Sequence, residues 1–210
     1  DAAGQAISTR LSAEIQGLAM ASRNAADAQS LIDTAEGAMQ ETHTVLLRMR
    51  ELAVQSANGT LTDADRQHTD AEFKQLQNEM DRISNNTKWA GQNLLDGRSF
   101  SFQVGEGAYQ TINVNIGNVS SYYPDDGGVE FVGVRGDYAT GNPIELDTVS
   151  QSQRAIEAID IAIDYVSSER GKLGAVSNRL DSTISNLDQV AVNLSASQGR
   201  IQDADFAQET

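Results

Sequence analysis

The residue types that most often perform chemistry are sparse and unfavourably spaced in this sequence. The chain has two histidines, His43 and His68, and no cysteine. The histidines fall on separate predicted helices and lack the His-Glu-x-x-His spacing of a zinc site. Serine, histidine and aspartate all occur, yet no Gly-x-Ser-x-Gly motif offers a serine nucleophile. We therefore predict no catalytic residue and no histidine-bound metal, and we interpret both histidines as solvated residues of helix faces.

Two further patterns invite a cofactor or ion interpretation. Gly105-Glu-Gly107 lacks the third glycine and the following helix of a dinucleotide-binding motif, and no P-loop lysine follows a glycine run. Asp125, Asp126 and Glu130 could offer carboxylate oxygens to calcium, but their spacing does not match the EF-hand loop. We predict turn glycines and a solvated acidic loop, no cofactor and no metal ion, and therefore no enzyme.

Composition narrows the class of protein further. Of 210 residues, 39% are hydrophobic and 5% aromatic, which favours thin helices packed along narrow seams over a thick globular core. Thirty acidic against fifteen basic residues give a net charge of −15, which disfavours binding to nucleic acid or anionic membranes. No apolar run reaches the length of a membrane span, so we predict no membrane insertion. The absence of cysteine is compatible with an exported protein.

Helical patterns occupy both flanks, because both prolines lie in the middle of the chain. Mostly small residues at alternating spacings of three and four predict a first long helix, which the Asn58-Gly59 turn should end. This seam comprises Ala25, Ala28, Ile32, Ala35, Met39, Thr42, Leu46, Met49, Ala53 and Ser56. Thr62 should cap a second helix with an apolar face that ends near Asn85-Asn86.

The most regular helical pattern follows the middle of the chain. A heptad repeat from Ile156 to Ile201 predicts one long, coiled-coil-grade helix. Its positions are Ile156, Ile159, Ile163, Val166, Arg170, Leu173, Ser177, Leu180, Ile184, Leu187, Ala191, Leu194, Gln198 and Ile201. Gly171 and Gly174 mark predicted kinks or close contacts.

The middle of the chain changes to alternating hydrophobicity. Phe100, Phe102 and Val104 precede the Gly105-Glu-Gly107 turn, and three alternating apolar residues follow it, so we predict a β-hairpin. The apolar residues after the turn are Ile112, Val114 and Ile116. Residues 117–147 contain glycine, both prolines and one short apolar run, and we predict a turn-rich segment there.

Several long motifs in this order resemble bacterial flagellin. They are Asp1-Ala-Ala-Gly-Gln-Ala-Ile7, Arg48-Met-Arg-Glu-Leu-Ala-Val-Gln-Ser-Ala-Asn-Gly59, Leu173-Gly-Ala-Val-Ser-Asn-Arg-Leu180 and Ile201-Gln-Asp-Ala-Asp-Phe206. The resemblance implies a mainly α fold, an elongated bundle of long antiparallel helices with a small β-hairpin-rich central region at one end. Residues 1–96 would form the N-terminal part of the rod, 97–147 the central region, and 148–210 the C-terminal helix.

The resemblance also implies a function. A flagellin is secreted and polymerises into the extracellular filament that drives motility, so the expected partners are other flagellin subunits and the hook-associated and cap proteins. In the family, further helical segments precede the first motif and follow the last one. We expect this sequence to be a core fragment that lacks both terminal coiled-coil segments and does not form a full filament alone.

A candidate contact patch follows from the same resemblance. Flagellins that Toll-like receptor 5 recognises present a patch whose positions correspond to Arg48, Leu52, Gln55 and Glu72 of this chain. Identity at these positions implies possible recognition, although Leu76 departs from the basic residue that often stands there. The same patch serves filament packing in the family, and ordinary helix surface is the alternative interpretation for Gln55 and Glu72.

A second hypothesis is a flagellin-like cell-surface adhesin or receptor for extracellular polysaccharide. Four tyrosines of the middle region offer rings that could stack on sugars, namely Tyr109, Tyr122, Tyr123 and Tyr138. The net charge opposes acidic glycans unless cations bridge them or Arg98 and Arg135 cluster locally. Packing of a small β-rich cap is the simpler interpretation of these tyrosines.

Overall fold

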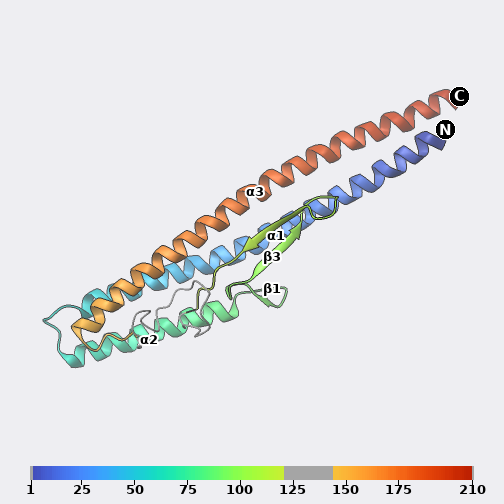
Figure 1. The fold of residues 1–210 in the computed structure, drawn as a ribbon. Coiled ribbons are helices and arrows are strands. Elements are labelled where there is room, and N and C mark those ends of the chain that lie inside the picture. Colours follow the sequence, from blue (N-terminus) through green and yellow to red (C-terminus); the bar gives the residue numbers. More distant parts are fainter. Residues whose placement is uncertain (1, 121–143, 210) are drawn as a thin grey trace. The chain divides into compact units, whose positions relative to one another are not determined.

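The computed structural model describes residues 2–120 and 144–209. Three long helices dominate them: α1 (Ala2–Ser56), α2 (Asp63–Asn86) and α3 (Val149–Glu209). Four short strands lie between α2 and α3 in the chain: β1 (Lys88–Trp89), β2 (Gln92–Asn93), β3 (Ser99–Gln103) and β4 (Thr111–Asn115). The predicted mainly α fold of long antiparallel helices with a small hairpin-bearing region is confirmed (Figure 1).

The chain divides into two compact units, and α1 and α3 contribute to both. Unit 1 comprises residues 1–32, 100–114 and 175–210. Unit 2 comprises residues 33–99 and 115–174. This division follows spatial contacts, whereas the division into 1–96, 97–147 and 148–210 follows chain order and stays a prediction.

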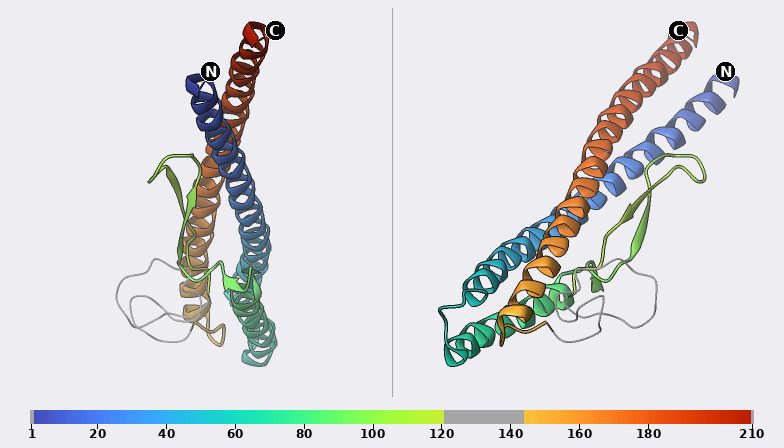
Figure 2. Two further views of the ribbon diagram at one scale, coloured as in Figure 1. Left: turned by 90° about the vertical axis from the view of Figure 1, so that its right-hand side faces the viewer. Right: turned by 60° about the vertical axis from the view of Figure 1, so that its left-hand side comes forward.

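In unit 1 the start of α1 and the end of α3 run side by side in opposite directions (Figure 2). Hydrogen bonds between polar side chains fix their register. Gln202 Nε2 donates to Ser8 Oγ at 2.9 Å, Ser22 Oγ to Asp188 Oδ1 at 3.1 Å, and Gln29 Nε2 to Asp181 Oδ1 at 2.7 Å. Along α1 the three contacting residues are separated by two heptads and then by one heptad. Their partners on α3 have the same separations in the opposite direction. The heptad spacing of the two helices therefore keeps their contacting positions in register.

The predicted β-hairpin belongs mainly to unit 1. β3 pairs with β4, and the Val104 amide donates to the Gln110 oxygen at 2.9 Å beyond the ends of the two strands. Ile112 and Val114 are buried, as the alternating pattern requires. Asn24 Nδ2 of α1 donates to the Gln103 oxygen at 3.0 Å, which fastens the hairpin to the helix.

Unit 2 has a closed apolar interior. All its α1 seam residues from Ala35 to Ser56 are fully buried, and Phe73 and Met80 of α2 are 0% exposed. On α3 the buried residues recur every seven positions, as predicted, at Ile159, Val166 and Leu173.

The predicted α3 heptads contain two sets of positions, each repeating every seven residues. In unit 2 the prediction is wrong for the set that contains Ile156 and Ile163. Ile156 and Ile163 are only half-buried, whereas Ala155, Ala162 and Glu169 are buried. In unit 2 the segment after β4 contacts α3 at Glu169, so the buried face of α3 is shifted by one residue toward this segment.

Glu169 serves a specific contact within unit 2. Its Oε2 accepts a hydrogen bond from the Gly117 amide at 3.1 Å, and its Oε1 pairs with Lys172 Nζ at 2.5 Å. A Cβ on Gly117 would lie 2.3 Å from the Tyr165 hydroxyl oxygen and 2.8 Å from Glu169 Oε2. Any side chain at position 117 would therefore require the ends of the Tyr165 and Glu169 side chains to move.

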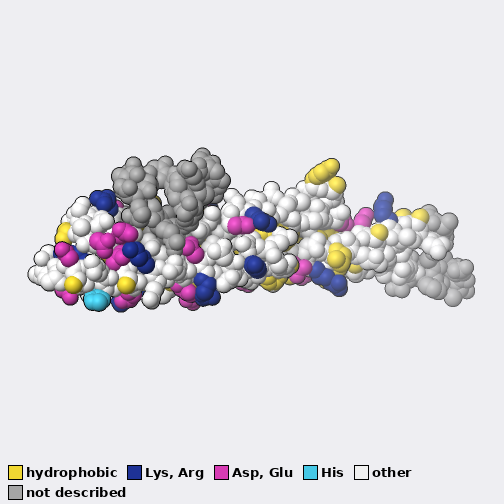
Figure 3. All heavy atoms as spheres, turned by 90° about the horizontal axis from the view of Figure 1, so that it is seen from below, with side chains coloured by type: hydrophobic (Ala, Val, Ile, Leu, Met, Phe, Trp, Pro, Cys, Tyr) yellow, Lys and Arg dark blue, Asp and Glu magenta, His cyan; other side chains and the backbone are white. Residues whose placement is uncertain are grey.

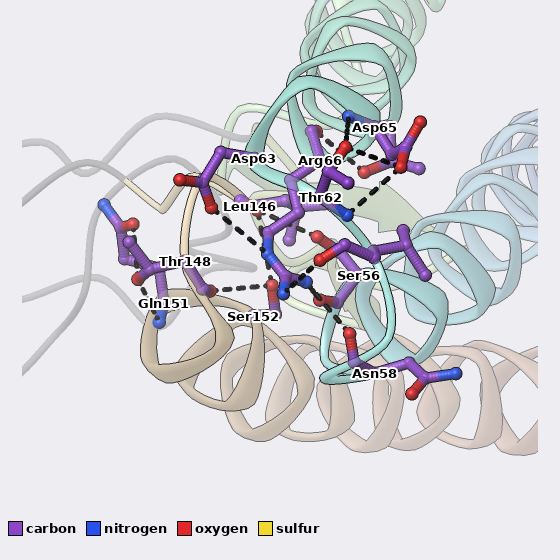
Figure 4. Close-up of polar contacts among 12 residues, drawn as sticks. Ser56, Asn58, Thr62, Asp63, Asp65, Arg66, Leu146, Thr148, Gln151 and Ser152 are labelled. Carbon is purple, nitrogen blue, oxygen red and sulfur yellow. Dashed lines mark hydrogen bonds and ion pairs between the residues drawn. The ribbon is translucent and has the colours of Figure 1, made fainter.

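The α1–α2 connection is held by buried polar groups (Figure 4). Thr62 Oγ1 accepts from the Asp65 amide, and the Asp65 carboxylate accepts from the Thr62 amide at 3.1 Å, which forms the predicted cap as a full capping box. Arg66 is 5% exposed and donates to main-chain oxygens of Ser56 (2.5 Å), Asn58 (3.1 Å) and Leu61 (3.0 Å). One arginine thus supplies donors to main-chain oxygens at the end of α1 and in the connection that follows it.

One local feature was not predicted from the sequence, and one predicted feature is absent. β1 pairs with β2 through Lys88↔Asn93 and Trp89↔Gln92, across a turn where Ala90 and Gly91 have φ of 48° and 81°. Gly171 and Gly174 do not mark close contacts, because a Cβ at either position would meet nothing within 4 Å.

Several predictions concern residues outside the described part of the chain. The acidic loop of Asp125, Asp126 and Glu130 lies there, as do Arg135 and three of the four tyrosines, Tyr122, Tyr123 and Tyr138. Over residues 2–120 and 144–209, no helix combines the length and apolarity needed to cross a bilayer.

Candidate functional site on helices α1 and α2

The candidate patch centres on an ion-paired arginine of α1. Arg48 Nε and Nη2 donate to Glu72 Oε1 of α2 at 2.9 and 2.7 Å, and Nη1 donates to Glu51 Oε2 at 2.9 Å. The side chains of Arg48 and Glu72 are about half exposed. Hydrogen bonds to Glu72 first and to Glu51 second raise the pKa of Arg48, so the guanidinium stays charged and oriented.

The four predicted patch residues do not share one environment. The structure brings Arg48 and Glu72 together, and it leaves Gln55 exposed on the last turn of α1. Leu52 is 2% exposed and packs inside unit 2. Leu52 therefore packs α1 against the rest of unit 2 and presents no surface to a partner.

Two exposed apolar residues of α1 were not singled out from the sequence. Leu47 and Val54 are 44% and 49% exposed, and each follows a buried seam residue, Leu46 or Ala53, by one position. They repeat one heptad apart, as Leu46 and Ala53 do. An apolar residue placed one step beyond a seam position is the signal that could have identified them.

Arg50 completes the exposed groups of this part of α1. Its Nε donates to Asp160 Oδ1 of α3 at 2.7 Å, and this hydrogen bond is the main cause of its raised pKa. Arg48 pairs with α2 and Arg50 with α3, so each of these two arginines reaches a neighbouring helix of unit 2. The surface beside Leu47 and Val54 is thus held in a defined shape.

A second polar cluster lies where the chain enters α3. Lys74 Nζ contacts Asp70 Oδ2 at 2.7 Å and Glu145 Oε1 at 3.2 Å, and the Leu146 amide donates to Asp70 Oδ1 at 2.9 Å. Burial, followed by repulsion from Asp70 and Glu145, raises the pKa of Asp147. The hydrogen bond to Asp70 is the main cause of the raised pKa of Lys74. This cluster joins elements of unit 2.

These groups suit recognition rather than bond chemistry. The side chains of Arg48, Arg50 and Glu72 are exposed, paired and oriented. Acidic and basic residues intersperse with small hydrophobic groups on the face in Figure 3. His43 and His68 lie on α1 and α2. No group of three or more residues that could hold a metal ion occurs in the described residues. The arrangement offers a surface with fixed charges and accessible apolar side chains.

Comparisons with known sequences cover the whole chain. Residues 1–99 match the family model of the bacterial flagellin N-terminal helical region, and residues 156–210 match that of the C-terminal helical region. Flagellin of Bacillus subtilis (strain 168) is 41% identical over 100% of this chain and 76% of its own length. The flagellar filament 33 kDa core protein of Treponema phagedenis is 37% identical over 100% of this chain and 74% of its own length.

Solved structures agree. The crystal structure of Bacillus cereus flagellin has a TM-score of 0.64 and 29% identity, over 84% of this chain and 94% of that one. A putative flagellar hook-associated protein from Vibrio parahaemolyticus has a TM-score of 0.76 over 95% of this chain and 98% of that one, and at 17% identity it shows the fold alone. No comparison supports the polysaccharide-binding hypothesis. The chain belongs to the bacterial flagellin family and is a structural subunit of the flagellar filament.

Proposed function

We propose that this filament subunit contacts neighbouring subunits through one surface of unit 2, the Arg48 surface. It consists of Arg48, Gln55 and Glu72 with the exposed apolar side chains Leu47 and Val54. The observation that carries the proposal is the pair of half-exposed aliphatic residues beside oriented, ion-paired charges. Apolar side chains among satisfied polar groups are the composition of protein interfaces.

The matched test compares Val54→Asp with Ile161→Asp in the full-length protein. Both residues are exposed aliphatic side chains of unit 2, at 49% and 69%, so neither change opens a cavity. We expect Val54→Asp to abolish or strongly slow polymerisation, because it places a charge where a neighbour packs. Sedimentation and light scattering measure the effect. Equal loss with Ile161→Asp, or normal filaments with Val54→Asp, would remove the special role of this surface.

The same surface is a proposed binding site for Toll-like receptor 5 on the unpolymerised subunit. Arg48→Glu should weaken receptor activation in a reporter-cell assay, since it leaves three carboxylates together. The double variant Arg48→Glu, Glu72→Arg restores the internal ion pair but exchanges the charges that a receptor meets. Recovery of folding without recovery of signalling supports direct contact. Full recovery of both would show that the pair acts only through helix packing.

We extend the proposal to the remaining partners and to domain roles. Residues 1–96 and 148–210 would pack in the filament, and residues 97–147 would form the outer part of the subunit. The flagellar hook-associated and cap proteins would contact the same helical units, and the chain would be secreted before assembly. Cross-linking of the exported protein to purified hook-associated protein tests this. Cross-links confined to residues 97–147 would contradict it.

A further inference from the structure

The turn between α1 and α2 contains an exposed Asn-Gly dipeptide whose reactive groups are accessible to solvent. Asn58 and Gly59 are both exposed, directly after the end of α1 at Ser56. Figure 4 shows the Asn58 carboxamide pointing away from the Arg66 guanidinium, which instead meets the main-chain oxygen of Asn58. The carboxamide is therefore not part of the clamp that holds the turn. We propose that Asn58 is a site of spontaneous modification, in which its side chain forms a succinimide with the Gly59 nitrogen.

One hydrogen bond prepares the electrophile. The Thr60 amide donates to Asn58 Oδ1 at 3.2 Å. A donor on a carbonyl oxygen stabilises the negative charge that develops there when a nucleophile adds to the carbon. The turn itself is maintained by the Leu61 amide, which donates to the Asn58 main-chain oxygen at 3.2 Å. The turn thus holds the Asn58 amide oxygen beside a fixed N–H group.

The nucleophile is equally accessible. Within the described residues, none accepts a hydrogen bond from the Gly59 amide. A Cβ on Gly59 would meet nothing within 4 Å, and its φ lies outside the left-handed region. Glycine is therefore not required there by the fold, but its lack of a side chain leaves the nitrogen and its two dihedral angles unhindered.

The chain contains a matched comparison at Asn118. The Ser120 amide donates to Asn118 Oδ1 at 2.9 Å, which repeats the contact at Asn58. The residue that follows is Val119, which is β-branched and 0% exposed, and its amide donates to the Leu95 oxygen at 3.3 Å. At Asn118 the nitrogen is occupied and shielded, so the same turn should be inert.

The reaction needs no cofactor and only water. A solvent base takes the Gly59 N–H proton, and the nitrogen attacks Asn58 Cγ. Nδ2 then takes a proton from solvent, its bond to Cγ breaks, and it leaves as ammonia. Water opens the resulting five-membered imide at either carbonyl, which gives an aspartyl or an isoaspartyl residue at position 58. Both products carry a new carboxylate.

The isoaspartyl product changes the turn as well as its charge. It adds one carbon to the main chain at the point where Asn58 receives hydrogen bonds from Arg66 Nη1 and the Leu61 amide. The Arg66 clamp must then lose or shift one of its three acceptors. We expect faster amide hydrogen exchange in residues 57–62 of the modified chain, and unchanged exchange in unit 1.

The experiment follows the folded chain in mildly alkaline buffer. Trypsin releases residues 51–66, in which Asn58 is the only asparagine, so a gain of one dalton reports its loss of ammonia. Isoaspartate is scored separately with an isoaspartyl methyltransferase, because only the succinimide route yields it. Gly59→Val should reduce the rate by more than about tenfold without unfolding the chain. Asn118 in the same sample should keep its amide.

Comparison with the chain in denaturant isolates the role of the fold. Modification of Asn58 in the folded chain at a rate equal to or above that of the denatured chain supports the proposal. Protection of Asn58 by folding would overturn it. An unchanged rate with Gly59→Val would overturn it too, as would equally fast modification of Asn118.

Discussion

Units 1 and 2 use the same two helices but different interiors. In unit 2, α1 and α3 meet α2 around fully buried Met39, Leu46, Phe73 and Met80. In unit 1 they meet through a thin apolar cluster, in which Leu18, Ala21 and Leu187 are buried while Ala191 and Leu194 are only partly so. Hydrogen bonds that serine and glutamine side chains donate to aspartate and serine oxygens flank that cluster.

The difference shows how stability is distributed along continuous helices. A third helix excludes water from unit 2, so its buried area contributes fully to the free energy of unfolding. Two helices and a hairpin leave the unit 1 seam partly wet, and exchanging hydrogen bonds with water gains little. We expect unit 1 to open at lower free energy than unit 2.

Truncation of the central aromatic side chain of unit 2 should have the largest effect. Phe73→Ala is expected to lower the free energy of unfolding by about 3–5 kcal/mol, because a fully buried ring leaves a cavity. Leu187→Ala in unit 1 should cost only about 2 kcal/mol, since its neighbours are partly exposed. Denaturant titration combined with native-state hydrogen exchange measures both. Equal losses of unfolding free energy for the two variants would contradict the expected difference in stability between the units.

Removal of the Arg66 clamp should come next. Arg66→Met removes the guanidinium donor from main-chain oxygens of Ser56, Asn58 and Leu61, of which Asn58 keeps the Leu61 amide, and should destabilise unit 2 by about 2–3 kcal/mol. Arg200→Met is the matched control, because Arg200 is exposed in unit 1, and it should change stability by less than about 0.5 kcal/mol. A small effect at Arg66 would mean that water replaces the guanidinium.

The polar seam of unit 1 should respond in the opposite direction. Gln198 Nε2 donates to the Ser8 oxygen and to Ser12 Oγ, at 3.2 and 2.5 Å. Gln198→Leu should stabilise unit 1 by about 0.5–1 kcal/mol, because apolar burial replaces bonds that water also offers. Slower hydrogen exchange near Leu18 and Leu187 is the measurement. Gln189→Leu, at an exposed position, serves as the control. A loss of stability with Gln198→Leu would contradict the interpretation that the contact between α1 and α3 in unit 1 is partly exposed to water.

The smallest effect concerns pH and is confined to unit 2. The pKa of Asp147 is raised above its ordinary 3.8 by burial and by Asp70 and Glu145, with Lys74 opposing. The folded state therefore binds this proton more readily than the unfolded chain does. The stability that this group contributes is fully present below pH 3.8 and is lost as pH rises through the higher folded pKa.

Asp147→Asn should remove that loss and stabilise unit 2 at neutral pH, by less than about 1 kcal/mol. Thermal unfolding of both proteins from acidic to neutral pH gives the comparison. Parallel stability curves would show that Asp147 titrates normally.

The sequence predicted those elements whose signal is local or periodic. The α1 seam, the Thr62 cap and the β3–β4 hairpin follow from spacing, capping chemistry and alternation, and the structure confirms them. The burial of Leu52 could not be predicted, because a seam pattern does not say how many helices surround it. The Arg66 clamp also escaped prediction, since its acceptors are main-chain oxygens that any residue supplies.

Glu169 and Gly117 give position 117 a narrow tolerance to change. A side chain there would meet the ends of the Tyr165 and Glu169 side chains, so a substitution requires these two groups to move and weakens the hydrogen bond from the Gly117 amide to Glu169. In a library containing every amino acid at position 117, selection for assembled filaments should favour glycine and alanine over larger residues. A second-site change that shortens Glu169 or removes the Tyr165 hydroxyl should widen the range of residues recovered there.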